Sequence, residues 1–133
     1  MPAPVPYLHF PGTAAEALDA YQAVFGGDVE RFTFAEFSRT DAAPDLVAHG
    51  QLRGPVDLFA ADIAGDEQPV SVEGVLFALL GVADAATSSR WFDALAADGT
   101  VLDPLQERPW GDFDGQVRDR YGVTWLIGYQ PER

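Results

Sequence analysis

Two short stretches of the chain carry polar side chains with the same spacing. In "HGQLR", His49, Gln51 and Arg53 alternate with small and apolar residues, and in "DGQVR", Gln116 and Arg118 repeat the pattern. Because side chains alternate between the two faces of a strand, each polar set shares one face. We expect the small and apolar residues to pack under a helix and the polar sets to face a cavity. The alternative is that the polar sets face solvent at the sheet rim without a specific role.

These side chains offer hydrogen bonding and proton transfer. His49 is the strongest acid–base candidate, because an imidazole titrates near neutral pH. The alternative is a structural histidine held by hydrogen bonds. Gln51 and Gln116 each supply a donor and an acceptor, and Arg118 can hold an anionic or carbonyl oxygen. We expect His49 and Gln51 to face Gln116 and Arg118 across one shared cavity. Together these side chains would orient a polar ligand within apolar walls.

Trp110 is the aromatic residue best suited to contact a ligand. It follows a proline and precedes a glycine in "RPWGDF", which places it in a loop. A loop tryptophan at the mouth of a cavity can stack on a flat or cationic ligand. The alternative is that Trp110 covers a sheet edge or a dimer contact. Trp91 and Phe92 lie at helical spacing from Leu95 and are expected in the core, whereas Trp125 could face either core or cavity.

Composition excludes several classes of function. The chain has 133 residues, with 21 acidic and 8 basic side chains, a net charge of −13 and no cysteine. An acidic surface repels phosphate backbones and attracts cationic small molecules, so we expect no nucleic-acid partner. The sequence lacks an apolar run of membrane-spanning length, a secretory signal, and the signatures of serine hydrolases, phosphate loops and zinc proteases. We therefore predict a cytoplasmic protein that does not associate with membranes.

The pattern of elements places these residues. A strand at 5–10 is followed by a helix that Thr13 and Glu16 open as a capping box, and the helix ends at Gly26-Gly27. Strands are then expected at 29–37, 46–53 and 56–62, with a loop over "SRTDAAPD".

The same order of elements recurs after a polar stretch. A strand at 75–82 precedes a helix capped by Asp84, and strands follow near 101–106, 116–119 and 124–129. The sequence therefore predicts an α+β fold of two tandem βαβββ modules that form a curved mixed sheet around a cavity. We expect one domain over residues 1–133, with module one at about 3–64, a linker at about 65–73 and module two at about 74–130.

Four stretches together resemble a known family. They are "PYLHFPGTAAEALDAYQAVFGG", "VAHGQL", "RWFDALAADG" and "PWGDFDGQVRDRYGVTWLIG", in that order along most of the chain. They resemble the vicinal oxygen chelate superfamily, which comprises glyoxalases, bleomycin-resistance proteins and dioxygenases, and within it the PhnB-like branch. The resemblance implies the two-module fold and a homodimer. It also implies either a metal-dependent enzyme or a metal-free protein that binds a small molecule.

The metal ligands of the superfamily's enzymes lie on the first and last strands of each module. In the first module, the matching positions are Pro6 or Leu8 on the first strand and Asp57 or Leu58 on the last. In the second module, the first strand "VLFALLG" contains no residue type that binds a metal, and the last strand offers Trp125 or Leu126. Three convergent nitrogen or oxygen ligands are usually needed. His9, His49 and Asp57 could meet within the first module, although alternation sets His9 opposite Leu8 and Phe10. We expect no bound metal and no cofactor.

The sequence thus favours a PhnB-like, metal-free protein that binds a small molecule. The predicted ligand-binding residues are His49, Gln51, Trp110, Gln116 and Arg118. A metal-dependent enzyme of the glyoxalase or dioxygenase type, acting on a small oxygenated substrate, is the alternative. A metal-free enzyme with His49 as base is a third hypothesis.

Overall fold

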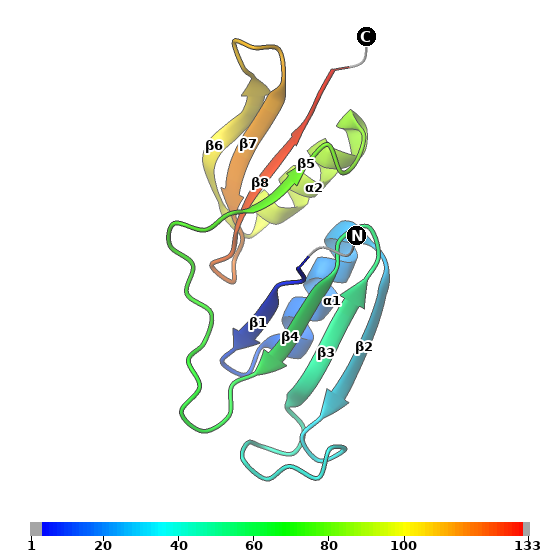
Figure 1. Cartoon of the computed structure of the whole chain (residues 1–133), viewed down its shortest axis with the longest axis vertical. Coiled ribbons are helices and arrows are strands. Elements are labelled where there is room, and N and C mark those ends of the chain that lie inside the picture. The colour runs from blue at the N-terminus through cyan, green and yellow to red at the C-terminus, as the bar shows by residue number, and fades with distance from the viewer. Residues whose placement is uncertain (1–3, 132–133) are drawn as a thin grey trace. The chain divides into compact units, whose positions relative to one another are not determined.

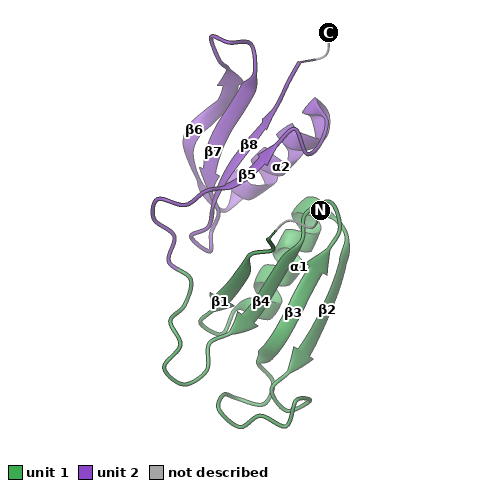
Figure 2. Cartoon of the chain, viewed as in Figure 1, with its two compact units in different colours: residues 1–70 green, residues 71–133 purple. Residues whose placement is uncertain are grey.

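The computed structural model describes residues 4–131 (Figure 1). The chain divides into two compact units, residues 1–70 and residues 71–133 (Figure 2). Each unit contains one four-stranded sheet and one helix, in the order strand, helix and three strands. The predicted α+β class and the repeated βαβββ order are confirmed.

In the first unit, α1 packs against a sheet with the strand order β1-β4-β3-β2. β1 is parallel to β4, and the other neighbouring strands are antiparallel. The helix buries residues at helical spacing, among them Ala17, Leu18 and Tyr21, against alternate residues of the strands such as Leu52 and Leu58. The elements are β1 (Tyr7–Phe10), α1 (Ala14–Phe25), β2 (Asp28–Thr33), β3 (Val47–Arg53) and β4 (Leu58–Asp62).

The second unit repeats this topology with the strand order β5-β8-β7-β6. β5 is parallel to β8, as β1 is to β4, and α2 packs against β6, β7 and β8. Trp91, Phe92 and Leu95 of α2 are buried, as their helical spacing predicts. Trp125 is also buried, which places it in the core. The elements are β5 (Phe77–Leu80), α2 (Ala85–Ala97), β6 (Thr100–Glu107), β7 (Phe113–Arg118) and β8 (Thr124–Tyr129).

The first helix begins where expected but is capped differently. The side chain of Thr13 makes no capping hydrogen bond. Instead, the backbone N–H of Ala14 donates to Oδ1 of buried Asp62 at 2.9 Å. The predicted side-chain cap by Thr13 is therefore wrong, and a carboxylate from β4 accepts the first N–H of the helix. In α2 the prediction is confirmed, since Asp84 Oδ1 accepts the N–H of Thr87 at 2.8 Å.

Three strands differ most in extent from the sequence patterns, and β5 covers only Phe77–Leu80 of the predicted 75–82. β2 ends at Thr33 rather than near residue 37, because Glu36 folds back and accepts hydrogen bonds from the Thr33 hydroxyl and backbone N–H. β7 begins at Phe113 rather than near residue 116, and the Phe113 ring stacks on Tyr129 of β8 at a centroid distance of 5.1 Å. Within residues 4–131, no helix is long and apolar enough to cross a membrane.

Candidate functional site

The open face of the first sheet is the face opposite α1. Gly50 of β3 lies under the helix, since a Cβ there would stand 2.5 Å from Leu18 Cδ1. His49 and Gln51 alternate with Gly50, so they lie on the open face, as the sequence predicts. Both are partly buried. Gln51 stands opposite Phe59 of β4 in the strand register.

Three rings from three strands meet on this open face, and we call Tyr7, His49 and Phe59 the ring cluster. Their centroids are 5.6 Å apart for Tyr7 and His49, 5.8 Å for Tyr7 and Phe59, and 5.5 Å for His49 and Phe59. A hydrogen bond of 2.9 Å joins the Tyr7 hydroxyl to Nδ1 of His49. The cluster therefore combines aromatic surface with a group that can gain or lose a proton.

Charged and polar neighbours surround the ring cluster. The Arg53 guanidinium lies over the Phe59 ring at 5.1 Å, and His9 meets Tyr7 edge-on at 5.6 Å. Burial and the charge of Glu67 raise the pKa of Tyr7 above 10.0, while Arg39 acts in the opposite direction. Tyr7 consequently keeps its phenolic proton at neutral pH and can donate it in a hydrogen bond.

The open face of the second sheet carries the second polar set. Gln116 and Arg118 alternate with buried Val117, and in the register Gln116 stands between Leu126 and Asp103. The Nε of Arg118 lies 3.4 Å from the Thr124 hydroxyl. The two glutamines and two arginines thus take corresponding places in the two sheets.

Asp114 takes the place of His49 in the second sheet, but it is part of an ion-pair network. Its carboxylate accepts a hydrogen bond from Arg108 Nε at 2.7 Å, and Arg108 also pairs with Asp103. Asp114 therefore offers no counterpart to the Tyr7–His49 pair.

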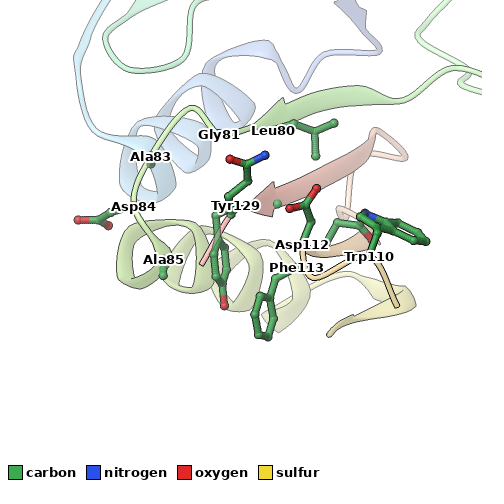
Figure 3. Close-up of a pocket in the computed structure, with 12 residues that line it drawn as sticks. Leu80, Gly81, Ala83, Asp84, Ala85, Trp110, Asp112, Phe113 and Tyr129 are labelled. Atoms are coloured by element: carbon green, nitrogen blue, oxygen red, sulfur yellow. The ribbon is translucent and has the colours of Figure 1, made fainter. Parts of the chain in front are cut away.

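Trp110 lines a pocket in the second unit, at the end of the sheet close to the N-terminus of α2. The pocket has a volume of about 550 Å³, and Trp110 is 68% exposed. In Figure 3, Asp112 lies between Leu80 and Trp110, and the paired rings of Phe113 and Tyr129 lie beside them. The lining residues are Leu80, Gly81, Ala83, Asp84, Ala85, Trp110, Asp112, Phe113, Asp114, Gly128, Tyr129 and Gln130.

Acidic groups set the charge of this pocket, which we call the Trp110 pocket. Its described lining contains three aspartates and neither Lys nor Arg. Hydrogen bonds from Thr87 lower the pKa of Asp84 below 3.8, so Asp84 is ionised at neutral pH. Figure 3 shows its carboxylate directed away from Asp112 and Trp110, which places this charge at the pocket rim. The Trp110 pocket thus combines aromatic and anionic groups.

The predicted site residues therefore fall into three groups. His49 lies beside Gln51 in the first unit, and Gln116 lies beside Arg118 in the second. Trp110 lines a pocket that includes Asp114 but neither Gln116 nor Arg118. The predicted cavity shared by the two polar sets stays a prediction.

The residues do not fit the metal centre of a glyoxalase-type enzyme. His9 and His49 share the open face, but Asp57 accepts a hydrogen bond from the N–H of Gly54 and lies 4.0 Å from Arg53, so it closes the β3–β4 turn. In the described part of the chain, no three His, Cys, Asp or Glu side chains are grouped to hold a metal ion.

Comparison with known proteins agrees with this fold. The model of the glyoxalase/bleomycin resistance protein/dioxygenase superfamily matches residues 6–127. The chain belongs to this superfamily. A PhnB protein from Bacillus cereus shares the fold with a TM-score of 0.75 and 20% identity, over 96% of this chain and 99% of that chain.

Two other proteins have higher sequence identity to this chain. Protein YjdN of Escherichia coli (strain K12) is 31% identical over 136 residues, which is 92% of this chain and 91% of YjdN. The crystal structure of protein PA1353 from Pseudomonas aeruginosa is 30% identical, with a TM-score of 0.85, over 99% of this chain and 100% of that chain.

Sequence reasoning missed Tyr7, Phe59 and Asp112. Tyr7 alternates with buried Leu8, as His9 does, so strand periodicity could have placed it on the open face. Nothing in the sequence indicated that β4 lies between β1 and β3, which is the arrangement that brings Phe59 and His49 to Tyr7. The strand order of the first sheet therefore creates the ring cluster.

Proposed function

We propose that this chain is a PhnB-like protein that binds a small molecule without a metal. The observation that carries the proposal is the Trp110 pocket, because its volume lies within the usual range of small-molecule sites. An exposed indole beside a carboxylate favours a flat ligand that carries positive charge. The net charge of −13 would also attract such a ligand.

The proposal assigns supporting roles to the two polar sets. His49 and Gln51 in the first unit, and Gln116 and Arg118 in the second, lie on open sheet faces where their side chains are not engaged with a helix. Each can hold a polar group of a ligand by hydrogen bonds. We also propose a homodimer and a cytoplasmic location, as predicted from the sequence.

Tryptophan fluorescence tests binding in the Trp110 pocket. Trp91 and Trp125 are 4% and 1% exposed, so a ligand that stacks on an indole from solvent quenches Trp110 selectively. Proflavine, a flat aromatic cation, should quench the emission in a saturable manner.

Two variants sharpen this test. Trp110→Phe should remove the saturable quenching and leave the fold intact, because the side chain is largely exposed. Asp112→Asn should weaken proflavine binding several-fold while the indole stays in place. A dissociation constant of proflavine above about 1 mM for the wild type would contradict the proposed ligand class.

The alternative is a metal-dependent enzyme acting on a small oxygenated substrate, and one observation favours it. His9 and His49, the two histidines of the chain, both contact Tyr7 on the same sheet face. Metal analysis of protein purified without chelator separates the hypotheses. We expect no stoichiometric transition metal. About one equivalent of zinc, iron, manganese or nickel, lost in His49→Ala, would contradict the metal-free binding proposal and favour the alternative.

A further inference from the structure

The Tyr7–His49 hydrogen bond can run in two directions. When His49 is neutral, the Tyr7 hydroxyl donates to Nδ1, and the imidazole carries its proton on Nε2. When His49 is protonated, both ring nitrogens are donors, so Nδ1–H donates to the Tyr7 oxygen. The Tyr7 hydroxyl is then free to donate its hydrogen bond to a ligand instead. Protonation of one imidazole therefore adds a positive charge and a second hydrogen-bond donor at the same place.

The ring cluster is accessible enough to receive a flat ligand. Tyr7 is 45% exposed, while His49 and Phe59 are partly buried and tilted against it at 46°. Aromatic surface of this kind binds a planar ring through offset or edge contacts. The ligand's ring and its polar group would thus have separate partners within the cluster.

Fixed positive charge is present on this face despite the acidic chain. The Arg53 guanidinium covers the Phe59 ring, and the charge of Arg39 acts on the Tyr7 hydroxyl. His9, edge-on to Tyr7, adds a second imidazole that can gain a proton. These groups favour an anionic ligand.

Acidic groups outnumber the two arginines around the ring cluster. Asp57 lies 4.0 Å from Arg53, Asp41 pairs with Arg39, and the charge of Glu67 acts on Tyr7. Glu30 stands opposite Gln51 in the register. Four carboxylates thus stand against two guanidinium groups, so a positive charge on His49 is what would offset the negative surroundings at the place where a carboxylate binds.

We propose that the ring cluster is a second ligand site, which binds an aromatic carboxylate and binds it more tightly when His49 is protonated. Tyr7 and protonated His49 donate hydrogen bonds to the carboxylate, and Phe59 contacts the ring of the ligand. The participation of His49 in ligand binding rests on the proposed function. The ligand class, the role of Tyr7 and the dependence on pH are new.

Calorimetry with 2-naphthoate tests this site at about pH 5.5 and about pH 8, on either side of the range in which imidazoles titrate. The probe stays ionised at both values, because carboxyl groups titrate near about 4. Binding should be about tenfold tighter at the lower pH. The neutral amide 2-naphthamide should show a much smaller difference between the two pH values, because it lacks the negative charge that protonated His49 attracts.

Three variants assign the effect to individual groups. Tyr7→Phe should reduce the ratio of the two dissociation constants to about threefold, because the charge of His49 remains while one donor is lost. In His49→Gln the two dissociation constants should be equal. His9→Gln is the matched control and should retain most of the wild-type ratio. Equal affinity of the wild type at both pH values, or a ratio that survives in His49→Gln, would overturn the proposal.

The two ligand sites can fail separately. Proflavine is followed by Trp110 emission in the second unit, whereas 2-naphthoate depends on Tyr7 and His49 in the first. If proflavine quenches the emission but naphthoate binding does not depend on pH, the proposal for the Trp110 pocket stands and the proposal for the ring cluster is contradicted. If naphthoate binding depends on pH but proflavine does not quench, the cationic ligand class is contradicted and the ring-cluster proposal stands.

Discussion

The carboxylate of Asp62, in the last position of β4, accepts the backbone N–H of Ala14, in the first position of α1, at 2.9 Å. Its second oxygen accepts the N–H of Val47, which begins β3, also at 2.9 Å. One buried side chain therefore joins the starts of a helix and a strand to the end of another strand. This junction holds together the elements that carry the ring cluster.

Asp62→Ala should destabilise the protein by roughly 2–5 kcal/mol, because two buried backbone donors lose their acceptor. Asp62→Asn should lower the free energy of unfolding by less, since the amide retains one acceptor oxygen. Thr13→Ala is the matched control and should cost below about 0.5 kcal/mol, as the Thr13 side chain makes no capping hydrogen bond. Urea unfolding measures all three. A larger loss in Thr13→Ala than in Asp62→Ala would show that the cap has been assigned to the wrong residue.

The cap of α2 should make stability depend on acid. Hydrogen bonds from Thr87 lower the pKa of Asp84 below 3.8, so its ionised form is the one that stabilises the folded state. This contribution is present above that value and disappears as the pH falls through the lowered pKa. At neutral pH, Asp84→Ala should therefore melt a few degrees below the wild type, and the difference should shrink in acid.

Asp84→Asn tests whether this difference arises from titration. Asparagine also caps helices but carries no titratable group, so its melting temperature should follow the wild type at neutral pH and vary less in acid. Thermal unfolding followed by circular dichroism at several pH values gives both curves. A melting temperature of Asp84→Ala equal to that of the wild type at pH 7 would rule out a stabilising cap.

The two glycines of the repeated stretch should differ in their tolerance of a methyl group. A Cβ at Gly50 would meet the flexible end of Leu18, whereas a Cβ at Gly115 would lie 2.6 Å from the backbone nitrogen of Leu105. Gly50→Ala should cost roughly 1–3 kcal/mol, and Gly115→Ala should cost more, because the backbone of β6 cannot yield as a side chain can. Urea unfolding of both variants measures the difference.

A double-mutant cycle identifies the contact responsible at Gly50. In a Leu18→Ala background, the cost of Gly50→Ala should fall, since the obstructing methyl group is absent. An unchanged cost would mean that the glycine is needed for another reason.

The predicted polar site residues should contribute to affinity. Once a ligand is in hand, His49→Ala and Gln116→Ala should each weaken binding by roughly 1–3 kcal/mol, the usual cost of leaving a buried polar partner unpaired. Isothermal titration provides the measurement. Unchanged affinity in both variants would mean that the repeat records only the duplication of a fold.

The assembly should be a homodimer with two-fold symmetry. The chain has a mass of 14.4 kDa and leaves apolar side chains such as Leu80, Val101 and Leu102 exposed. Burial of such surface stabilises an interface. Light scattering at micromolar concentration should therefore give about twice the chain mass, and a value equal to the chain mass would disprove the dimer.

Periodicity in the sequence determined the elements and their faces. The alternation of "HGQLR" placed His49 and Gln51 opposite the helix, and the spacing of Trp91, Phe92 and Leu95 placed these side chains in the core. These are local properties, because the face of a side chain depends on its position along its own strand or helix. The repeated order of elements was readable for the same reason.

Only the tertiary structure decided which residues meet. Tyr7 meets His49 because β4 lies between β1 and β3, and Asp62 accepts the first N–H of α1 because β4 ends beside that helix. Trp125 was ambiguous until Asp119 was seen to accept its indole N–H at 2.9 Å. Such pairings depend on the order of strands across a sheet and on distances between segments remote in sequence, which periodicity along one segment does not encode.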